Sequence, residues 1–307
     1  MRILVTGGAG FIGRHLIRSL LKGKNEIIIY ENFSNSSKKE IKDIINDGAK
    51  IIKGDLTNFK LLKRSLQDID NVIHLAANID IPESIKRPEK SHEINVTGSM
   101  NLLRASILNG ISGLIGASSA AIYGDPKNLP VTENTIPNPV SPYGADKLAM
   151  EYYIKAFSNT FNFNSVSLRF FNVYGIDQSN AYAGVITKFM EKIENDKPLQ
   201  IFGDGKHTRD YVFIEDLVQG IQKTLKKLKG KRGNIYNIAS GRSYSVNELA
   251  KILLSIYGKK LQILHVSPRK GDLRFSSTSI SLAKKELNYS PKYNLKQGLT
   301  KMLNESN

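Results

Sequence analysis

Apolar strands and amphipathic helices alternate along the first half of the chain, and this alternation limits the fold more than any other feature of the sequence. Runs such as EIIIY and SVSLRFF are typical of strands covered on both faces of a sheet. Strands that alternate with helices pair in parallel, so we expect an α/β fold with a doubly wound parallel sheet. The expected strands are 3–6, 26–30, 49–55, 71–77, 112–119 and 165–171, and the expected helices are 11–21, 38–47, 59–67, 143–157 and a longer one within 89–109.

Beyond about residue 170 the alternation loosens, and glycine-rich polar segments precede amphipathic helices expected at 246–258 and 281–289. A short strand is expected between these helices, at 261–266. The pattern predicts a smaller C-terminal cap domain over the carboxyl ends of the strands, where open α/β sheets bind ligands. We therefore expect one domain at 1–169 and a second at 170–307, with some later segments returning to the first sheet.

Composition excludes several classes of protein. The chain is 40% hydrophobic and 23% charged, a globular rather than a disordered profile. It has no cysteine, which excludes disulfides, thiolate metal sites and a cysteine nucleophile, and we expect no metal. No apolar stretch is long enough to span a bilayer, and no signal-peptide region precedes the first strand. We expect a cytoplasmic protein with no membrane partner.

The net charge of +16 raises the question of a polyanionic partner. The lysines are scattered, however, and the densest runs, SSKKEIKD and KKLKGKRG, lack the interleaved aromatic residues of a nucleic-acid site. We therefore expect no nucleic-acid partner. The excess charge is that of a solvated lysine-rich surface with some attraction for an anionic substrate.

The stretch TGGAGFIG connects the first strand to the first helix. Glycines at such a turn let the unpaired amides at the start of a helix approach a pyrophosphate closely. Turns also need glycine for purely conformational reasons, so the triplet alone leaves nucleotide binding open. The residues expected to contact a dinucleotide here are Gly7, Gly10, Phe11, Ile12 and Gly13.

Further dinucleotide contacts are expected where the next strands end. Glu31 follows the turn by about 20 residues, where a carboxylate accepts hydrogen bonds from ribose hydroxyls and repels a 2′-phosphate, which favours NAD over NADP. A helix N-cap or a loop acid is the alternative reading of Glu31. The expected cofactor-binding residues at these strand ends are Glu31, Asn32, Asp55, Leu56, Leu75, Ala76 and Ala77.

Candidate catalytic residues lie at two places. Tyr143 and Lys147 are four residues apart, on one face of a helix, while Ser118 and Ser119 end a buried strand. A tyrosine has a reference pKa of about 10, and a lysine together with a positive nicotinamide ring would favour its phenolate. Tyrosine and lysine at this spacing also occur by chance. Combined with the glycine turn and the strand-end serine, the pair predicts removal of a hydroxyl proton during hydride transfer.

Eight motifs occur in the order found in extended short-chain dehydrogenase/reductases that act on nucleotide sugars, and the chain resembles most closely the UDP-glucose 4-epimerases among them. The motifs are TGGAGFIG, GDL, HLAA, SSAAIYG, SPYGADK, RFFNVYG, RDYVF and RKGD. The resemblance covers almost the whole chain. It implies a Rossmann domain that binds NAD at 1–169 and a nucleotide-sugar-binding domain at 170–307.

The resemblance also implies roles for single residues. Ser119 would be the catalytic hydroxyl, Tyr143 the base and Lys147 its partner. Asn95 would support the cofactor, and Phe171 would face the nicotinamide. The residues that the resemblance assigns to a UDP-sugar substrate are Ser119, Tyr143, Asn172, Phe202, Arg209, Tyr211, Arg269, Asp272 and Ser276.

The same resemblance separates two reactions. Related 4,6-dehydratases carry an acidic pair after the catalytic hydroxyl, and here those positions are Ala120 and Ala121, so elimination lacks its proton carriers. We expect C4 epimerisation through a 4-keto sugar with retained NAD. Ser276 stands where a bulky tyrosine would exclude an N-acetyl group, so the expected substrates extend from UDP-glucose and UDP-galactose to UDP-N-acetylhexosamines.

Two alternatives stay open at this point. One is another nucleotide-sugar epimerase, reductase or decarboxylase of the same family, and the other is a non-catalytic NAD-binding regulator. A homodimer is expected, because the helices within 89–109 and at 143–157 carry more apolar residues than one sheet face needs and the family commonly pairs them.

Overall fold

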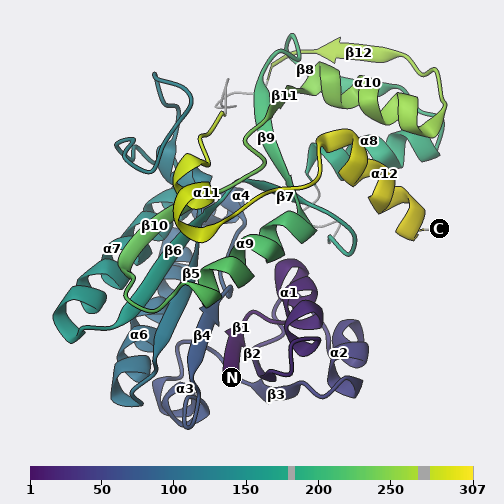
Figure 1. Ribbon diagram of the computed structural model, residues 1–307. Helices are drawn as coiled ribbons and strands as arrows, with labels where there is room; N and C mark the ends of the chain where they lie inside the picture. The colour runs from purple at the N-terminus through teal and green to yellow at the C-terminus, as the bar shows by residue number, and fades with distance from the viewer. Residues whose placement is uncertain (179–183, 269–276, 307) are drawn as a thin grey trace.

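The structure, a computed structural model, describes residues 1–178, 184–268 and 277–306 (Figure 1). Its centre is a seven-stranded sheet in the order β10-β6-β5-β4-β1-β2-β3, and every neighbouring pair is parallel. The predicted doubly wound parallel sheet is confirmed. Its strands are β1 (Arg2–Thr6), β2 (Glu26–Glu31), β3 (Lys50–Lys53), β4 (Asn71–His74), β5 (Gly113–Ser119), β6 (Asn164–Phe170) and β10 (Arg232–Ile238).

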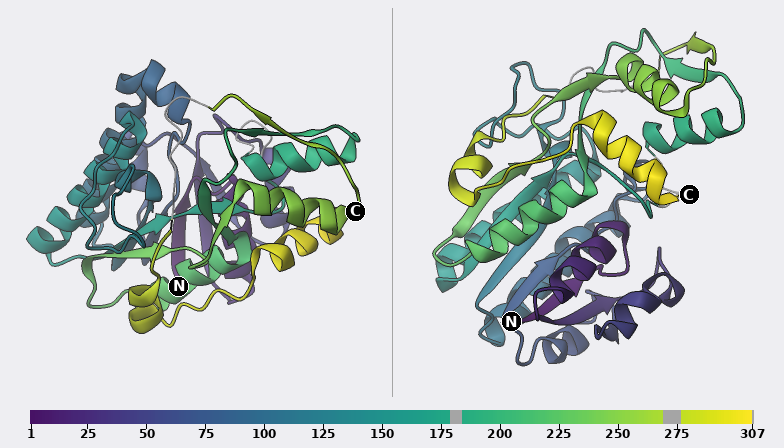
Figure 2. Two further views of the ribbon diagram at one scale, coloured as in Figure 1. Left: turned by 90° about the horizontal axis from the view of Figure 1, so that it is seen from above. Right: turned by 45° about the vertical axis from the view of Figure 1, so that its right-hand side comes forward.

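Helices cover both faces of this sheet (Figures 1 and 2). Alternate strand residues serve opposite faces: Ile3 and Val5 belong to the core under α1 and α9, whereas Leu4 belongs to the core under α3, α6 and α7. The helices around the sheet are α1 (Phe11–Leu21), α2 (Lys42–Asn46), α3 (Phe59–Ser65), α4 (Ile81–Lys86), α5 (Pro88–His92), α6 (Gly98–Leu108), α7 (Pro142–Phe161), α9 (Ile214–Lys226) and α11 (Ser281–Leu287).

The cap lies over the carboxyl ends of the strands, at the upper right of Figure 1. It holds a three-stranded sheet, β11-β9-β7, and a two-stranded sheet, β12-β8. Its strands are β7 (Asn172–Tyr174), β8 (Leu199–Phe202), β9 (Thr208–Phe213), β11 (Ser243–Ser245) and β12 (Ile263–Val266), and its helices are α8 (Val185–Glu194), α10 (Val246–Tyr257) and α12 (Leu295–Ser306).

Several elements differ from the sequence prediction. The fourth strand ends at His74 rather than at 77, because the amide of Ala76 bonds to the Thr6 hydroxyl instead of continuing the ladder. The helix expected at 38–47 begins as a 3₁₀ helix, Lys38–Ile41. The helix expected within 89–109 is interrupted by a π-helical turn, Glu93–Thr97.

Two elements from the second half of the sequence lie in the first half's layers. β10 pairs with β6 at the edge of the large sheet, and α9 packs against α1. Neither element was predicted by residue from the sequence. The expected boundary between residues 169 and 170 stays a prediction.

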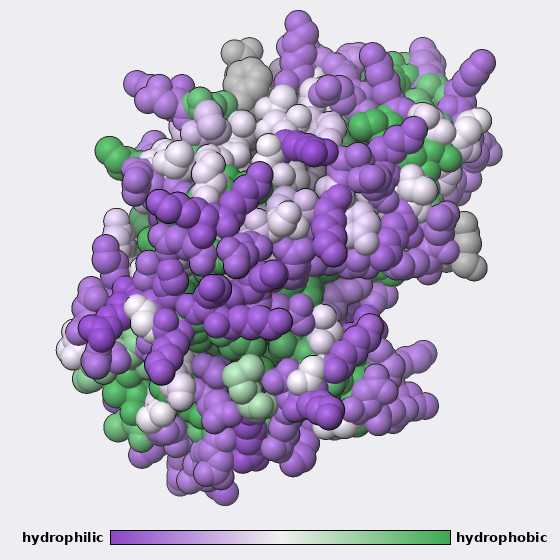
Figure 3. All heavy atoms as spheres, viewed as in Figure 1, coloured by the Kyte–Doolittle hydropathy of each residue, from purple (hydrophilic) through white to green (hydrophobic). Residues whose placement is uncertain are grey.

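The molecular surface is predominantly polar on the face shown in Figure 3. Across the described ranges, the helices are all too short or too polar to cross a membrane.

Candidate active site

The glycine turn has no room for side chains. Gly7 has φ of 69°, and a Cβ added there would lie 2.7 Å from the amide nitrogen of Ala76. A Cβ on Gly13 would lie 2.5 Å from the carbonyl oxygen of Gly7. Gly10 is the N-cap of α1 and has no side chain to bond to the first amides of the helix. This cradle fits a pyrophosphate, which the amides and the helix dipole would bind.

Glu31 closes the other side of the turn. Its Oε2 accepts a hydrogen bond from the amide of Ala9 at 3.2 Å, and its Oε1 accepts one from the amide of Phe33 at 3.0 Å. The side chain is buried. Glu31 therefore holds the glycine turn in place and keeps a negative charge beside it, where the sequence analysis expects the adenosine ribose.

Asn32 and Asp55 are in contact, as expected for two residues of one subsite. The side-chain Nδ2 of Asn32 donates to Asp55 Oδ2 at 2.7 Å, and the backbone amide and the hydroxyl of Thr57 donate to Asp55 Oδ1. Burial alone would raise the pKa of Asp55, but these hydrogen bonds outweigh it and hold the pKa below its ordinary value. Leu56, the next residue, is buried against Gly98 of α6.

Asn95 fixes the chain after β4. Its Oδ1 accepts from the amide of Asn78 at 2.8 Å, and its Nδ2 donates to the Asn78 carbonyl oxygen at 3.0 Å. Asn95 lies on the π-helical turn, a local distortion often found at functional sites. Leu75, Ala76 and Ala77 precede Asn78, so this clamp determines the position of the segment expected to face the cofactor.

His74 supports the same region, and the sequence analysis missed it. It bridges Thr6 Oγ1 at 2.8 Å and Ser99 Oγ at 2.9 Å, while Ser99 donates to the carbonyl oxygen of Asn95. Burial, with a smaller effect of the Lys147 charge, lowers the pKa of His74 to about 3, so the imidazole is neutral. The signal that could have revealed it is a polar residue at the end of an apolar strand.

Ser119, Tyr143 and Lys147 come together at the carboxyl end of β5. The Tyr143 side chain lies beside Ser119, which lowers the pKa of the phenol, and Lys147 Nζ lies 6.0 Å from the centroid of the Tyr143 ring. Lys147 Nζ also donates to the carbonyl oxygen of Ala117 at 2.8 Å. α7 begins at this place because Pro142 occupies its first turn and the Ser141 side chain accepts from the amide of Gly144.

Burial shifts both titratable groups of this cluster. It raises the pKa of Tyr143, and the neighbouring Ser119 side chain offsets only part of that rise. Burial also lowers the pKa of Lys147 to about 8, against the opposing charges of Asp146 and Glu151. Lys147 is therefore largely protonated at pH 7. The acidic phenol that the sequence analysis expects stays a prediction for the cofactor-bound protein, because it needs a further positive charge.

A cavity of about 360 Å³ in the cap brings together four residues that the sequence analysis assigns to the substrate. Asn172 of β7 is the register partner of Tyr211 of β9, and Arg209 lies two residues earlier on the same face of β9. Phe202, at the end of β8, completes the four.

Other residues that line this cavity were not predicted from the sequence. Its further polar lining includes Gln178, Gln200 and His207, and its apolar wall comes from Val185, Ile186, Phe189, Ile201 and Val246. Arg269, Asp272 and Ser276 lie outside the described residues.

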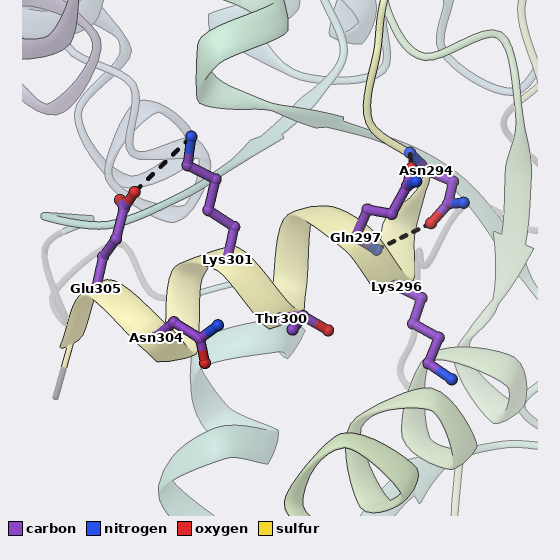
Figure 4. A pocket seen from close by; sticks show the side chains of 7 residues that line it. All are labelled: Asn294, Lys296, Gln297, Thr300, Lys301, Asn304 and Glu305. Atoms are coloured by element: carbon purple, nitrogen blue, oxygen red, sulfur yellow. Dashed lines mark hydrogen bonds and ion pairs between the residues drawn. The ribbon is translucent and has the colours of Figure 1, made fainter.

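Phe171 is buried directly after β6. Its amide donates to the carbonyl oxygen of Ile238, and its ring lies 6.3 Å from that of Tyr123. A separate surface recess of about 570 Å³ follows α12 and is shown in Figure 4. It is lined by polar residues between 294 and 305 and contains none of the predicted site residues.

The chain is similar to known proteins over nearly its whole length. A model of the NAD dependent epimerase/dehydratase family matches residues 3–239. A putative UDP-glucose 4-epimerase from Methanocaldococcus jannaschii is 36% identical over 306 residues, which cover 98% of this chain and 97% of that protein.

Two solved structures have the same fold. UDP-glucose 4-epimerase from Thermotoga maritima, solved with UDP-glucose, has a TM-score of 0.91 and 34% identity and matches over 99% of this chain and 98% of its own. UDP-N-acetylglucosamine 4-epimerase from Methanobrevibacter ruminantium, in complex with UDP-N-acetylmuramic acid, has a TM-score of 0.93 and 30% identity over 99% and 97% of the two chains. The predicted resemblance to nucleotide-sugar epimerases and the predicted cofactor, NAD, are confirmed. The chain belongs to the NAD dependent epimerase/dehydratase family.

Proposed function

We propose that the protein interconverts UDP-glucose and UDP-galactose by epimerisation at C4, through a 4-keto intermediate. The observation that carries the proposal is that Ser119, Tyr143 and Lys147 lie together at the carboxyl end of the sheet, which the cap with its Arg209-lined cavity covers. The cavity is large enough for part of a nucleotide sugar, and its mixed polar and apolar lining suits a charged diphosphate with an attached base.

The residues of the cluster divide the proton transfer between them. Ser119 and Tyr143 bind the 4-hydroxyl of the sugar, and Tyr143 removes its proton. Lys147 stabilises the phenolate through its charge. Gly7, Gly10 and Gly13 would hold NAD, which would supply reversible hydride transfer at C4. Tyr143 then gives the proton back to O4, so the protein ends the cycle unchanged.

The turn after Ser119 favours epimerisation over loss of water. Ala120 and Ala121 form the start of a 3₁₀ turn beside the cluster and offer no group that could carry a proton. Elimination of the 6-hydroxyl would need both an acid and a base at these positions. The sugar therefore rotates about its diphosphate link, and its 4-keto group is then reduced without loss of water.

The decisive assay incubates the purified protein with UDP-glucose, or with UDP-N-acetylglucosamine, without added NAD and separates the products. A C4 epimer of UDP-glucose without net NADH supports the proposal. A dehydrated sugar or a stoichiometric yield of NADH contradicts it.

We propose that the N-acetylated sugar is also a substrate, and we expect Ser276→Tyr to remove that activity while UDP-glucose is still converted.

We expect Arg209→Gln to raise the KM for UDP-glucose about 10- to 100-fold with little change in kcat. A charge-assisted hydrogen bond to phosphate contributes about 1.5–3 kcal/mol, and the diphosphate does not change during the reaction. Initial rates over a range of substrate concentrations measure both constants. Arg232→Gln, at an exposed position on β10, is the matched control. An unchanged KM in Arg209→Gln would argue against the assigned diphosphate site.

We expect Glu31→Gln to increase the share of NADP relative to NAD bound by the protein about tenfold, because the charge that repels a 2′-phosphate is removed. Glutamine keeps one carbonyl oxygen that can accept a hydrogen bond. Cofactor is exchanged against an equimolar mixture of NAD and NADP, released and quantified. Glu26→Gln, at the exposed start of the same strand, is the control. An unchanged ratio would mean that Glu31 only fastens the turn.

A homodimer that pairs α6 and α7 also stays a proposal. Tyr152 and Phe161 of α7 are 60% and 52% exposed, and Leu108 of α6 is 59% exposed. These exposed apolar side chains support contact of the two helices with a second copy of the chain.

A further inference from the structure

A buried ion pair lies directly behind the catalytic cluster. Arg169 Nε donates to Glu151 Oε1 at 2.9 Å and its Nη2 donates to Oε2 at 2.8 Å, and the two side chains are only 3% and 1% exposed. Removing such charges from water is costly, and an apolar pair can often replace them without loss of stability. A contribution to folding stability alone therefore does not explain why two charged residues are buried here.

The contacts of Glu151 give that explanation. Ser118 Oγ donates to Glu151 Oε1 at 2.5 Å, and Lys147 Nζ donates to the carbonyl oxygen of Ala117. The side chain of Ser119 lies beside Tyr143. Ala117 and Ser118 of β5 are thus hydrogen-bonded to α7, and the next residue, Ser119, faces it. The three α7 residues involved are spaced four apart, on one face of the helix, and Glu151 is the last of them.

Arg169 extends the same network across the sheet. Its Nη1 donates to the Tyr123 hydroxyl at 2.8 Å, and Tyr123 donates to Asn237 Oδ1 at 2.6 Å. Arg169 is also the register partner of Ser118 in the adjacent strand. Glu151 is therefore held from both sides, by the strand that ends at the catalytic serine and by its neighbour.

We propose that Glu151 is a positioning residue: held by Arg169 and Ser118, it fixes the end of β5 that carries Ser119 against α7, and its carboxylate balances the buried ammonium of Lys147. The proposal rests on the proposed function for its catalytic consequence. Its structural part, the charge balance at Lys147, does not depend on the substrate.

Few other groups near Lys147 can compensate its positive charge. Asp146 on α7 is the other carboxylate, and it is already engaged by Ser91 and by His92 of α5. His74 of β4 is neutral, and β5 contributes only serine hydroxyls and a carbonyl oxygen. Burial lowers the pKa of Lys147 to about 8 despite both carboxylates. Loss of the Glu151 charge must lower that pKa further, towards the pH at which the enzyme works.

The test compares three variants. Glu151→Gln removes the negative charge but leaves the buried Arg169 without its ion-pair partner, which destabilises the fold. The double variant Glu151→Gln/Arg169→Met removes both buried charges, so it is expected to fold even where the single variant does not. Ser118→Ala keeps both charges and removes only the tether. Glu286→Gln, whose partner is Lys231 at the surface, is the control.

Two readouts separate positioning from general structure. The first is kcat for UDP-glucose as a function of pH. We expect the midpoint of the alkaline loss of activity to fall by about one pH unit in the variants lacking Glu151, because Lys147 deprotonates earlier. In Ser118→Ala we expect about a tenfold lower kcat with an unchanged midpoint and an unchanged KM. The control should match the unmodified protein in both respects.

The second readout does not need activity. NMR of protein labelled with ¹³C at lysine Cε, with Lys147→Met to assign the signal, measures the titration of Lys147 directly. A lower titration midpoint in the double variant supports the proposal even if the unmodified protein converts no UDP-hexose, in which case only the proposed function has failed. An unchanged Lys147 midpoint, or an unchanged kcat in Ser118→Ala on an active protein, overturns it.

Discussion

Tyr143→Phe is expected to lower the rate of C4 epimerisation by about 10³-fold or more while the protein stays folded and keeps its NAD. The substitution removes one oxygen atom and leaves the buried ring in place. A positioned acid–base group contributes about 10²- to 10⁴-fold to a rate, and Ser119 has no comparable acidity of its own. The loss should therefore appear in kcat, with little change in KM.

The control for this prediction lies on the same helix. Tyr152 is 60% exposed on α7, and Tyr152→Phe removes the same atom away from the cluster. We expect its rate to match that of the unmodified protein. The measurement is the initial rate of UDP-galactose formation together with the NAD content of the purified variants. A Tyr143→Phe protein that retains NAD and most of its rate would refute the assigned role.

Gly13→Ala is expected to reduce bound NAD more than tenfold and to lower the free energy of unfolding by about 1–3 kcal/mol, the usual cost of an added methyl group in a filled space. The new Cβ would lie 2.5 Å from the Gly7 carbonyl oxygen and 2.6 Å from Gly8 Cα. Both are backbone atoms, so the turn must move, and the amides that form the pyrophosphate cradle move with it.

Gly23→Ala is the control for this prediction, and Gly23 lies just beyond the C-terminal end of α1. There the nearest atom to the added Cβ is the flexible Asn25 side-chain amide at 3.1 Å. We expect this variant to keep its NAD and most of its stability. Released NAD per protein and chemical denaturation measure the two effects. Full NAD content in Gly13→Ala would show that the turn is not the dinucleotide site.

The sequence predicted the parallel sheet because strand and helix patterns alternate along its first half. It was less informative for the seventh strand. β10, with the sequence RGNIYNI, mixes polar and apolar residues and has a register shift between Arg232 and Asn234. α9 has a clear helical pattern, but it lies beyond the point at which the chain enters the cap, so the pattern alone does not show that the chain returns.

The glycine turn and the catalytic cluster were predictable for a different reason. The glycine turn is one short stretch of sequence, and Tyr143 and Lys147 are one helical turn apart. Ser119 ends a parallel strand, so it lies at the same edge of the sheet as the glycine turn. The supporting residues were not predictable in this way. His74, Glu151 and Arg169 act through partners 18 to 68 residues away, and only the folded chain shows which partner each one has.

The acid–base properties of Tyr143 also depended on the fold. The sequence shows that Lys147 is near, but it does not show that burial acts on both groups and raises the pKa of the phenol. This finding gives more weight to the positive charge of the bound cofactor and to the Ser119 side chain, both of which lower the pKa of the phenol. It also explains why the balance of charge around Lys147 matters.

The most direct test of the account follows a label at the carbon that reacts. UDP-glucose carrying deuterium at C4 is incubated with the purified protein in ordinary water, and the UDP-galactose formed is examined by mass spectrometry and NMR. If C4 is oxidised and the same hydride is returned, the product keeps the deuterium at C4. Replacement of the label by hydrogen, or its appearance in solvent, would contradict the proposed mechanism.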